Sequence, residues 1–186
     1  MTKTTIISGE LLSKFITLKK LSGTVAFLEY LQKRNHLKDF SIFCKRNSYK
    51  LHLPEKLPSG VLFHGSEKLQ SLLIPNISIG PNGKTEKETL VYATDDPNYG
   101  IFLAVLNLKN GSASVIADGK KPKLFVDIDF INGPSKIKNG FVHIVSNQSF
   151  RKIKNKECVI DTTVPILFII SVKPQDLTVP IYIQTK

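Results

Sequence analysis

The sequence is poor in the residues from which several kinds of functional site are built. Only two of its 186 residues are cysteines, Cys44 and Cys158, and only three are arginines, Arg34, Arg46 and Arg151. Each cysteine stands in an apolar run typical of a strand, far from the other, which indicates two buried thiols in a reducing compartment rather than a disulfide scaffold. The four histidines and two cysteines show no metal-ligand spacing, so we expect no metal.

Long apolar runs are lacking as well. The most apolar window, residues 164–172, has nine residues, which is too short to cross a bilayer. Residues 1–9 hold no apolar run of the length that a signal peptide needs. We therefore expect a cytoplasmic protein without a membrane partner.

Acidic residues are outnumbered, and the net charge is +11. Residues 1–60 carry 11 Lys or Arg against 4 Asp or Glu, residues 111–186 carry 11 against 6, and residues 61–110 carry 4 against 5. A basic surface attracts nucleic acid, anionic lipid or acidic protein without specifying which. A lysine-rich proteome would give the same excess, and these lysines form no tract and no aromatic-plus-basic motif. The basic charge flanks a nearly neutral central stretch.

The first third of the chain has the spacing of apolar residues that is typical of helices. Residues 8–35 predict two short helices interrupted at Gly23, with Ser22 as the N-cap of the second. Residues 40–44 and 49–53 are strand-like, and two prolines then favour an extended linker. We interpret residues 1–57 as a helical, basic N-terminal extension and residues 58–186 as the main domain.

The rest of the chain predicts one helix and a series of strands. Pro97 suits the first turn of a helix, with Asp95 or Asp96 as its N-cap and an end near Asn110. Strands that follow a helix and pair among themselves favour an α+β fold with a mostly antiparallel core. The candidate strands are residues 112–117, 123–129, 140–145, 157–160 and 165–172.

Two short strands each end in polar residues. Residues 61–66 are an apolar run that finishes in His64-Gly65-Ser66, and residues 90–94 carry Tyr92 and stop at an Asp-Asp-Pro-Asn turn. Polar groups at the ends of rigid strands are typical of binding sites. Each residue also has a structural interpretation: Gly65 permits a close approach, Tyr92 belongs to the core, and His64 is a satisfied structural histidine. His143, in an alternating strand, is expected on the polar face.

These two motifs resemble the His and Tyr motifs of the ADP-ribosyltransferase superfamily, in its His-Tyr-Glu branch. The resemblance extends over residues 58–186 and includes small uncharacterised bacterial proteins with a similar His-Gly-Ser motif. It implies an ADP-ribosyltransferase-like antiparallel core. It also implies an NAD-dependent enzyme that moves ADP-ribose to a nucleophile on a macromolecule. The acceptor is left open between protein and nucleic acid, and nucleic acid is suggested by the basic charge alone.

The resemblance assigns a role to each motif residue. His64 would hydrogen-bond the adenosine ribose, the Gly65 backbone would hold the nicotinamide carboxamide, Ser66 would add a hydroxyl, and Tyr92 would stack on the nicotinamide ring. Breaking the bond between nicotinamide and ribose passes through an oxocarbenium-like state, which a nearby carboxylate stabilises. The family supplies this carboxylate from a glutamate at the start of a late strand.

Glu157 matches that glutamate best, because it opens the strand at 157–160. It would bind the 2′-hydroxyl of the nicotinamide ribose and stabilise the transition state. Its structural interpretation is an exposed carboxylate that neutralises the neighbouring lysines Lys154 and Lys156. If the strand register differs, the candidate acids are Asp161, Asp127 and Asp129.

Two departures from the family restrict the acceptor. Arginine-specific members carry an Arg in the first motif and an acidic residue or Gln two positions before the glutamate, where this chain has His64 and Asn155. The tRNA 2′-phosphotransferases of the same fold depend on extra arginines, of which this chain has few. The alternatives left open are an NAD glycohydrolase and a catalytically inactive module that binds nucleic acid or protein. We expect residues 151–156 and the basic N-terminal third to face the acceptor.

Overall fold

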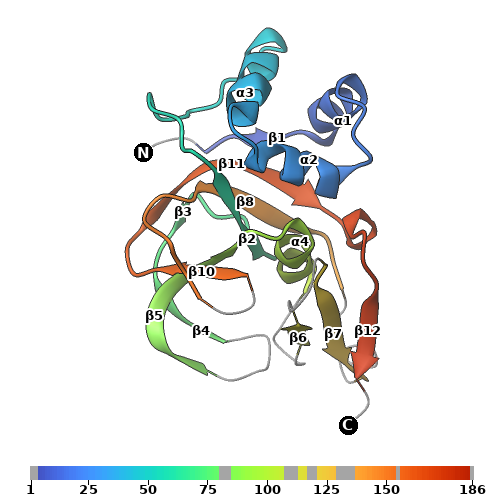
Figure 1. Ribbon diagram of the computed structural model, residues 1–186, viewed down its shortest axis with the longest axis vertical. Helices are drawn as coiled ribbons and strands as arrows, with labels where there is room; N and C mark the ends of the chain where they lie inside the picture. Colours follow the sequence, from blue (N-terminus) through green and yellow to red (C-terminus); the bar gives the residue numbers. More distant parts are fainter. Residues whose placement is uncertain are drawn as a thin grey trace.

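The protein is built from helices packed on a large, mostly antiparallel sheet, with a smaller sheet beside it (Figure 1). The computed structural model describes residues 4–79, 85–106, 113–116, 121–128, 137–153 and 156–184. The α+β class predicted from the sequence is confirmed. Within the described residues, no helix is long and apolar enough to cross a membrane.

Three helices precede the main strands: α1 (Gly9–Leu18), α2 (Thr24–Gln32) and α3 (His36–Arg46). The first two confirm the predicted pair. Ser8 caps α1, because its hydroxyl accepts the Leu11 N–H at 3.2 Å. The N-cap of α2 is Gly23, at φ 130°, and not the predicted Ser22. Gly23 suits this position because only glycine adopts such a φ without strain.

The predicted strand over residues 40–44 is wrong, because these residues form the centre of α3. Phe40 and Cys44 are both buried, and their spacing of four residues places them on one face of the helix. Residues 49–53, also predicted as a strand, belong to no helix or strand. Both cysteines are free and buried, as predicted. Burial raises the pKa of the Cys44 thiol to about 12, so this thiol is unreactive.

Within the described residues, nine strands form the large sheet in the order β1-β11-β8-β2-β5-β10-β9, with β3 beside β11 and β4 beside β5. Only the pairing of β1 with β11 is parallel. The tyrosine strand β5 is longer than predicted. In chain order the strands are β1 (Ile6–Ile7), β2 (Val61–Ser66), β3 (Leu72–Leu73), β4 (Asn76–Ile79), β5 (Thr85–Thr94), β8 (Gly140–Ser146), β9 (Arg151–Lys152), β10 (Glu157–Ile160) and β11 (Val164–Val172).

The smaller sheet has the order β12-β7-β6 in the described residues, and β12 runs parallel to β7. Its strands are β6 (Ala113–Ile116), β7 (Lys123–Asp127) and β12 (Ile181–Gln184). A 3-10 turn, Pro174–Asp176, leads from β11 to β12. Four of the five predicted strands after the helix lie in these two sheets nearly as predicted, and the fifth, 112–117, is described over Ala113–Ile116.

The N-terminal helices share one core with the large sheet. Phe15, Phe27 and Phe40, one from each helix, meet edge to face at centroid distances of 4.9 to 5.8 Å. Phe40 also contacts Phe168 of β11 at 5.3 Å. Figure 1 shows α1–α3 lying together on one side of this sheet. Helices α1–α3 are therefore joined to the large sheet through buried aromatic rings.

The fourth helix, α4 (Pro97–Val105), is enclosed between the two sheets. Its start is as predicted, because Asp96 is the N-cap and accepts the Tyr99 N–H at 3.1 Å. It ends at Val105, earlier than predicted. Almost every residue of α4 is buried, as expected of a helix that is apolar all round. A Cβ at Gly65 would lie 2.1 Å from the Gly100 carbonyl oxygen, so Gly65 permits the close approach of α4 to β2.

Candidate functional site

The predicted site residues lie on three neighbouring strands of the large sheet. His64, Gly65 and Ser66 end β2, Tyr92 lies on β5, and Glu157 opens β10. The sheet order places β5 between β2 and β10. Strands that are separated by up to about ninety residues of sequence are thus brought next to one another.

His64 is held by the strand beside it. Its Nδ1 lies 2.7 Å from the Tyr92 carbonyl oxygen. Because a carbonyl only accepts hydrogen bonds, Nδ1 carries the proton and Nε2 keeps its lone pair. Burial lowers the pKa of His64, and the hydrogen bond to the Tyr92 carbonyl opposes this shift. His64 is therefore a neutral imidazole with a fixed tautomer, which can accept one hydrogen bond.

His143 of β8 is the partner of His64 in the register, and their ring centroids are 5.6 Å apart. His143 is fully buried, so the expectation that it faces the polar side is wrong. Its Nε2 accepts the Gln70 N–H at 3.1 Å, and its Nδ1 donates to the His64 carbonyl at 3.2 Å. Burial and the neighbouring His64 lower the pKa of His143 to about 4. The ring supports the end of β2 in its neutral form.

Ser66 closes the turn that follows β2. Its hydroxyl accepts the Lys68 N–H at 3.1 Å and the Gln70 side-chain amide at 3.3 Å. These two bonds stabilise the chain between β2 and β3, since a serine hydroxyl that accepts the N–H two residues on is a common turn device. In the structure, Ser66 therefore stabilises this turn.

Glu157 is bound to a residue that sequence reasoning missed. The Tyr99 phenol, from α4, donates a hydrogen bond to the Glu157 carboxylate. Tyr99 is buried and Glu157 is half-buried. Burial, and then the charge of Glu157, raise the pKa of Tyr99, so the phenol keeps its proton. A glutamate with a fixed donor and a half-exposed carboxylate is suited to bind a hydroxyl or to stabilise positive charge.

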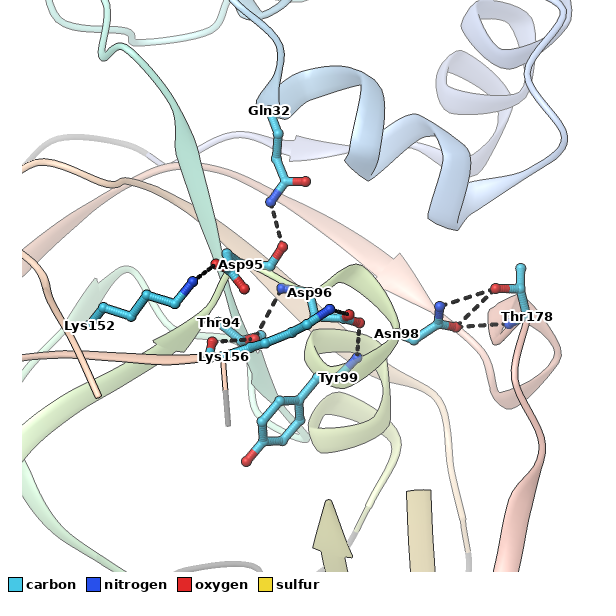
Figure 2. A network of polar contacts seen from close by, with 9 residues as sticks. All are labelled: Gln32, Thr94, Asp95, Asp96, Asn98, Tyr99, Lys152, Lys156 and Thr178. Atoms are coloured by element: carbon cyan, nitrogen blue, oxygen red, sulfur yellow. Dashed lines mark hydrogen bonds and ion pairs between the residues drawn. The ribbon is translucent and has the colours of Figure 1, made fainter. Parts of the chain in front are cut away.

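A network of polar contacts holds Tyr99 in this position (Figure 2). Asp96, the N-cap of α4, also forms a salt bridge of 2.8 Å with Lys156, the residue before Glu157. Thr94 donates to the Lys156 carbonyl at 2.9 Å and accepts the Asp96 N–H at 3.1 Å. The start of α4 and the start of β10 are therefore fastened to each other, which fixes the phenol against the carboxylate.

The same network ties the site to the N-terminal helices and to the 3-10 turn. The Gln32 side chain, at the end of α2, donates to the Asp95 carbonyl at 2.6 Å. The Asn98 side chain accepts the Thr178 backbone N–H at 2.9 Å, and its amide is bonded to the Thr178 hydroxyl at 3.1 and 3.2 Å (Figure 2). Segments from both ends of the chain thus hold the first turn of α4.

Alternation along the strands separates His64 from Glu157. Phe63 is paired with Thr94, and Thr94 is paired with Glu157, so these three side chains share the face that meets α4. Tyr92, two residues before Thr94, lies on that face as well. His64 follows Phe63 directly and leaves β2 on the opposite face. The structure places Tyr92 and Glu157 on one face, and the His64 ring on the other.

The other predicted acids are placed differently. Asp161 is exposed just after β10, and Asp127 lies on β7 of the smaller sheet. Asp129, Lys154 and Asn155 lie outside the described residues. Lys156 forms a salt bridge with Asp96, and Glu157 is half-buried and accepts from Tyr99. The interpretation of Glu157 as a partner of Lys154 stays a prediction.

One feature of the sequence could have drawn attention to Tyr99. It stands three residues after the N-cap Asp96, where the backbone N–H is a usual partner of the capping side chain. That signal gives no partner, because Glu157 lies 58 residues away along the chain.

Comparisons of the chain with protein-family models, with curated proteins and with solved structures give no match. The chain is therefore assigned to the α+β class by its structure alone. Within the described residues, no three His, Cys, Asp or Glu side chains are grouped to hold a metal ion.

Proposed function

We propose that this protein is an NAD-dependent ADP-ribosyltransferase that moves ADP-ribose to a macromolecular nucleophile other than arginine. The observation that carries the proposal is the contact between Tyr99 and Glu157 beside Tyr92. A half-buried carboxylate, oriented by a phenol and next to a second aromatic residue, supplies charge stabilisation and a ring for stacking. The adjacency of the strands that carry His64, Tyr92 and Glu157 supports the same proposal.

In this proposal Glu157 is the catalytic residue. Its carboxylate binds the 2′-hydroxyl of the nicotinamide ribose and stabilises the positive charge that develops as nicotinamide leaves. Tyr99 is a positioning residue, because its hydrogen bond fixes the direction of the carboxylate. Tyr92 stacks on nicotinamide, and the backbone of Gly65 holds the carboxamide.

His64 is the part of the proposal with the most restrictive geometry. Its Nε2 can accept a hydrogen bond from a ribose hydroxyl, because Nδ1 is occupied by the Tyr92 carbonyl. Its ring, however, leaves the sheet on the face opposite Glu157. β2 and β5 pair at one position only, Phe63 with Thr94. An NAD molecule that contacts both His64 and Glu157 would have to run from one face of the sheet to the other. The place for this is beyond the Phe63–Thr94 pair, where β2 and β5 are no longer paired.

That geometry favours a second candidate, a catalytically inactive module of the same fold. If the two faces do not serve one ligand, His64 and His143 are structural, and the fold binds nucleic acid or protein without turnover. An NAD glycohydrolase differs from the first candidate only in using water as the acceptor.

The experiment that tests the proposal measures nicotinamide release from NAD and transfer of labelled ADP-ribose to macromolecules of a cell lysate. We expect release by the unaltered chain and a loss of about 100-fold or more in kcat for Glu157→Gln. Asp161→Asn removes an exposed carboxylate a few residues away and is the matched control, with expected activity unchanged.

Tyr99→Phe tests the positioning role. It removes only the phenol oxygen, so we expect a fall of about 10-fold in kcat with little change in KM, because the carboxylate loses its fixed direction. Release without macromolecular labelling would indicate the glycohydrolase. Binding of NAD without release, at any acceptor concentration, would refute the enzymatic proposal and favour the inactive module.

A further inference from the structure

A groove follows the segment 50–61, between the α2–α3 junction and the edge of the large sheet. One part, of about 590 Å³, lies beside α2 and α3. The other, of about 750 Å³, lies beside the starts of β3 and β11. Both parts are lined by Lys56, Pro58 and Gln148, so they are continuous. In Figure 1 this segment is the chain between α3 and β2. We call the two parts together the basic groove.

The charges that line the basic groove are all of one sign. No Asp or Glu is among its described lining residues. All its basic side chains are exposed, and none forms a salt bridge with a described acid. The basic residues of the groove are Lys33, Arg34, Lys38, Lys50, His52 and Lys56. A concave surface of this kind attracts a polyanion.

The basic stretch nearer Glu157 differs in this respect. Arg151 is paired with Glu88 at 3.1 Å, and Lys152 is paired with Asp95 at 2.7 Å. These pairs neutralise two of the residues in the stretch 151–156, which the sequence predicted to face an acceptor. The groove cations, in the basic N-terminal third, have no such partner among the described acids.

The second part of the groove adds an apolar surface to this charge. Phe150, Leu72 and Ile160 line it, together with the hydroxyls of Thr162 and Thr163. Single-stranded nucleic acid combines phosphates, which cations neutralise, with bases, which stack on aromatic and apolar side chains. An acidic peptide or a duplex would use the cations and leave the ring of Phe150 without a base. We propose that the basic groove binds single-stranded nucleic acid.

A smaller hollow adjoins the basic groove. Its volume is about 350 Å³, and it shares Ser59 and Gly60 with the first part and Phe150 with the second. It reaches Cys158, whose side chain leaves β10 on the face opposite Glu157, and its charged residues are the paired Asp95 and Lys152. The role of a bound strand as the ADP-ribose acceptor rests on the proposed function, whereas its binding does not.

The test is binding of a fluorescein-labelled oligouridylate of about 12 nucleotides to the full chain at low salt, measured by anisotropy. The variant Lys33→Gln/Arg34→Gln/Lys56→Gln removes three groove cations, and Lys14→Gln/Lys121→Gln/Lys123→Gln removes the same charge elsewhere. We expect the groove variant to bind at least about 10-fold more weakly, with a salt dependence (the slope of log K against log salt) shallower by about 2, and the control to bind nearly as the unaltered chain.

Three outcomes would overturn the proposal. They are no binding by the unaltered chain, an equal loss in both variants, and competition by a poly-glutamate of equal length as strong as that of unlabelled oligouridylate. The last would indicate an acidic protein partner instead. Phe150→Leu keeps an apolar side chain without a ring face, and we expect it to bind at least about 5-fold more weakly. The assay contains no NAD, so an absence of binding would not refute NAD turnover. Inactivity of Glu157→Gln in the turnover assay would likewise not refute binding of nucleic acid.

Discussion

At the scale of single residues, hydrogen bonds fix both rings of the histidine pair, His64 and His143. His143 donates through Nδ1 and accepts through Nε2, so both nitrogens are satisfied only when the ring is neutral. A second proton on Nε2 would face the Gln70 N–H, which is itself a donor. Protonation of His143 would therefore break its hydrogen bond with Gln70, which holds the chain between β2 and β3.

This requirement predicts a stability that falls in acid. The pKa of His143 is about 4 in the folded chain and 6.5 ordinarily, so between these values the unfolded chain binds more protons. The contribution is complete above about pH 6.5 and is lost as the pH falls toward 4, by up to about 3 kcal/mol in the free energy of unfolding. His64, whose pKa is also lowered, acts in the same direction.

Urea unfolding at several pH values between 7 and 4 measures this effect. His143→Gln has no proton to take up at this position, so we expect a lower stability at pH 7 and a weaker pH dependence. His52→Gln, at an exposed histidine, is the control and should follow the unaltered chain. An equal pH dependence in all three proteins would show that His143 is not the group responsible.

The roles of single residues were the hardest to predict from the sequence. The neutral, buried state of His143 depends on Gln70 and His64, which lie 73 and 79 residues away. The partner of Glu157 likewise comes from α4 and not from its own strand. Local spacing carries no information on such contacts, because they form only when the sheet is assembled.

At the scale of elements, the packing of α4 on β2 depends on the absence of a side chain at Gly65. The nearest atoms to a Cβ there would be the Gly100 carbonyl oxygen at 2.1 Å and the Ala104 nitrogen at 2.6 Å. Both belong to the backbone of a helix enclosed on both sides, which has no room to move. Gly65 thus sets the distance between the sheet and the helix that carries Tyr99.

Gly65→Ala is therefore expected to lower the free energy of unfolding by about 1–3 kcal/mol, because overpacking displaces α4 from β2. Gly9→Ala is the matched control, since a Cβ there meets nothing within 4 Å, and it should change stability by less than about 1 kcal/mol. Thermal or urea unfolding of the three proteins measures the difference. A Gly65→Ala variant as stable as the control would contradict the described packing.

The elements themselves were predicted well where two signals agreed. Asp96-Pro97 marked the start of α4 through a cap and a proline, and the strands at 140–145 and 165–172 had apolar runs bounded by turn residues. The strand predicted over residues 40–44 was wrong because a short apolar run fits both the two-residue period of a strand and the 3.6-residue period of a helix. Phe40, Ile42 and Cys44 alternate as in a strand, while Phe40 and Cys44 also share a helix face.

At the scale of the whole molecule, helices α1–α3 share a core with the large sheet. The rings of α1, α2 and α3 are buried against one another and against β11. Burying a large aromatic side chain contributes about 1.5–3 kcal/mol, and the net stability of a domain is only about 5–15 kcal/mol. Without these helices, the sheet would lose burial energy comparable to the whole free energy of unfolding of a domain.

A shortened chain of residues 58–186 is therefore expected to show no cooperative unfolding transition and to aggregate. Circular dichroism during heating and size-exclusion chromatography would measure this beside the full chain. Phe15→Ala in the full chain tests the same core more gently, and we expect it to lower the free energy of unfolding by about 3–5 kcal/mol. A shortened chain that melts cooperatively would instead define 58–186 as an independent domain.

The parallel pairing of β1 with β11 also governs the order in which the protein can fold during synthesis. Ile6 lies beside Ile169 in the register, so β1 can pair only after β11 has been synthesised. Until then the phenylalanines of the leading helices have no sheet to cover them. Pairings between such distant segments slow folding and leave apolar surface open to aggregation. We therefore expect the newly made chain to expose apolar surface until β11 has been synthesised.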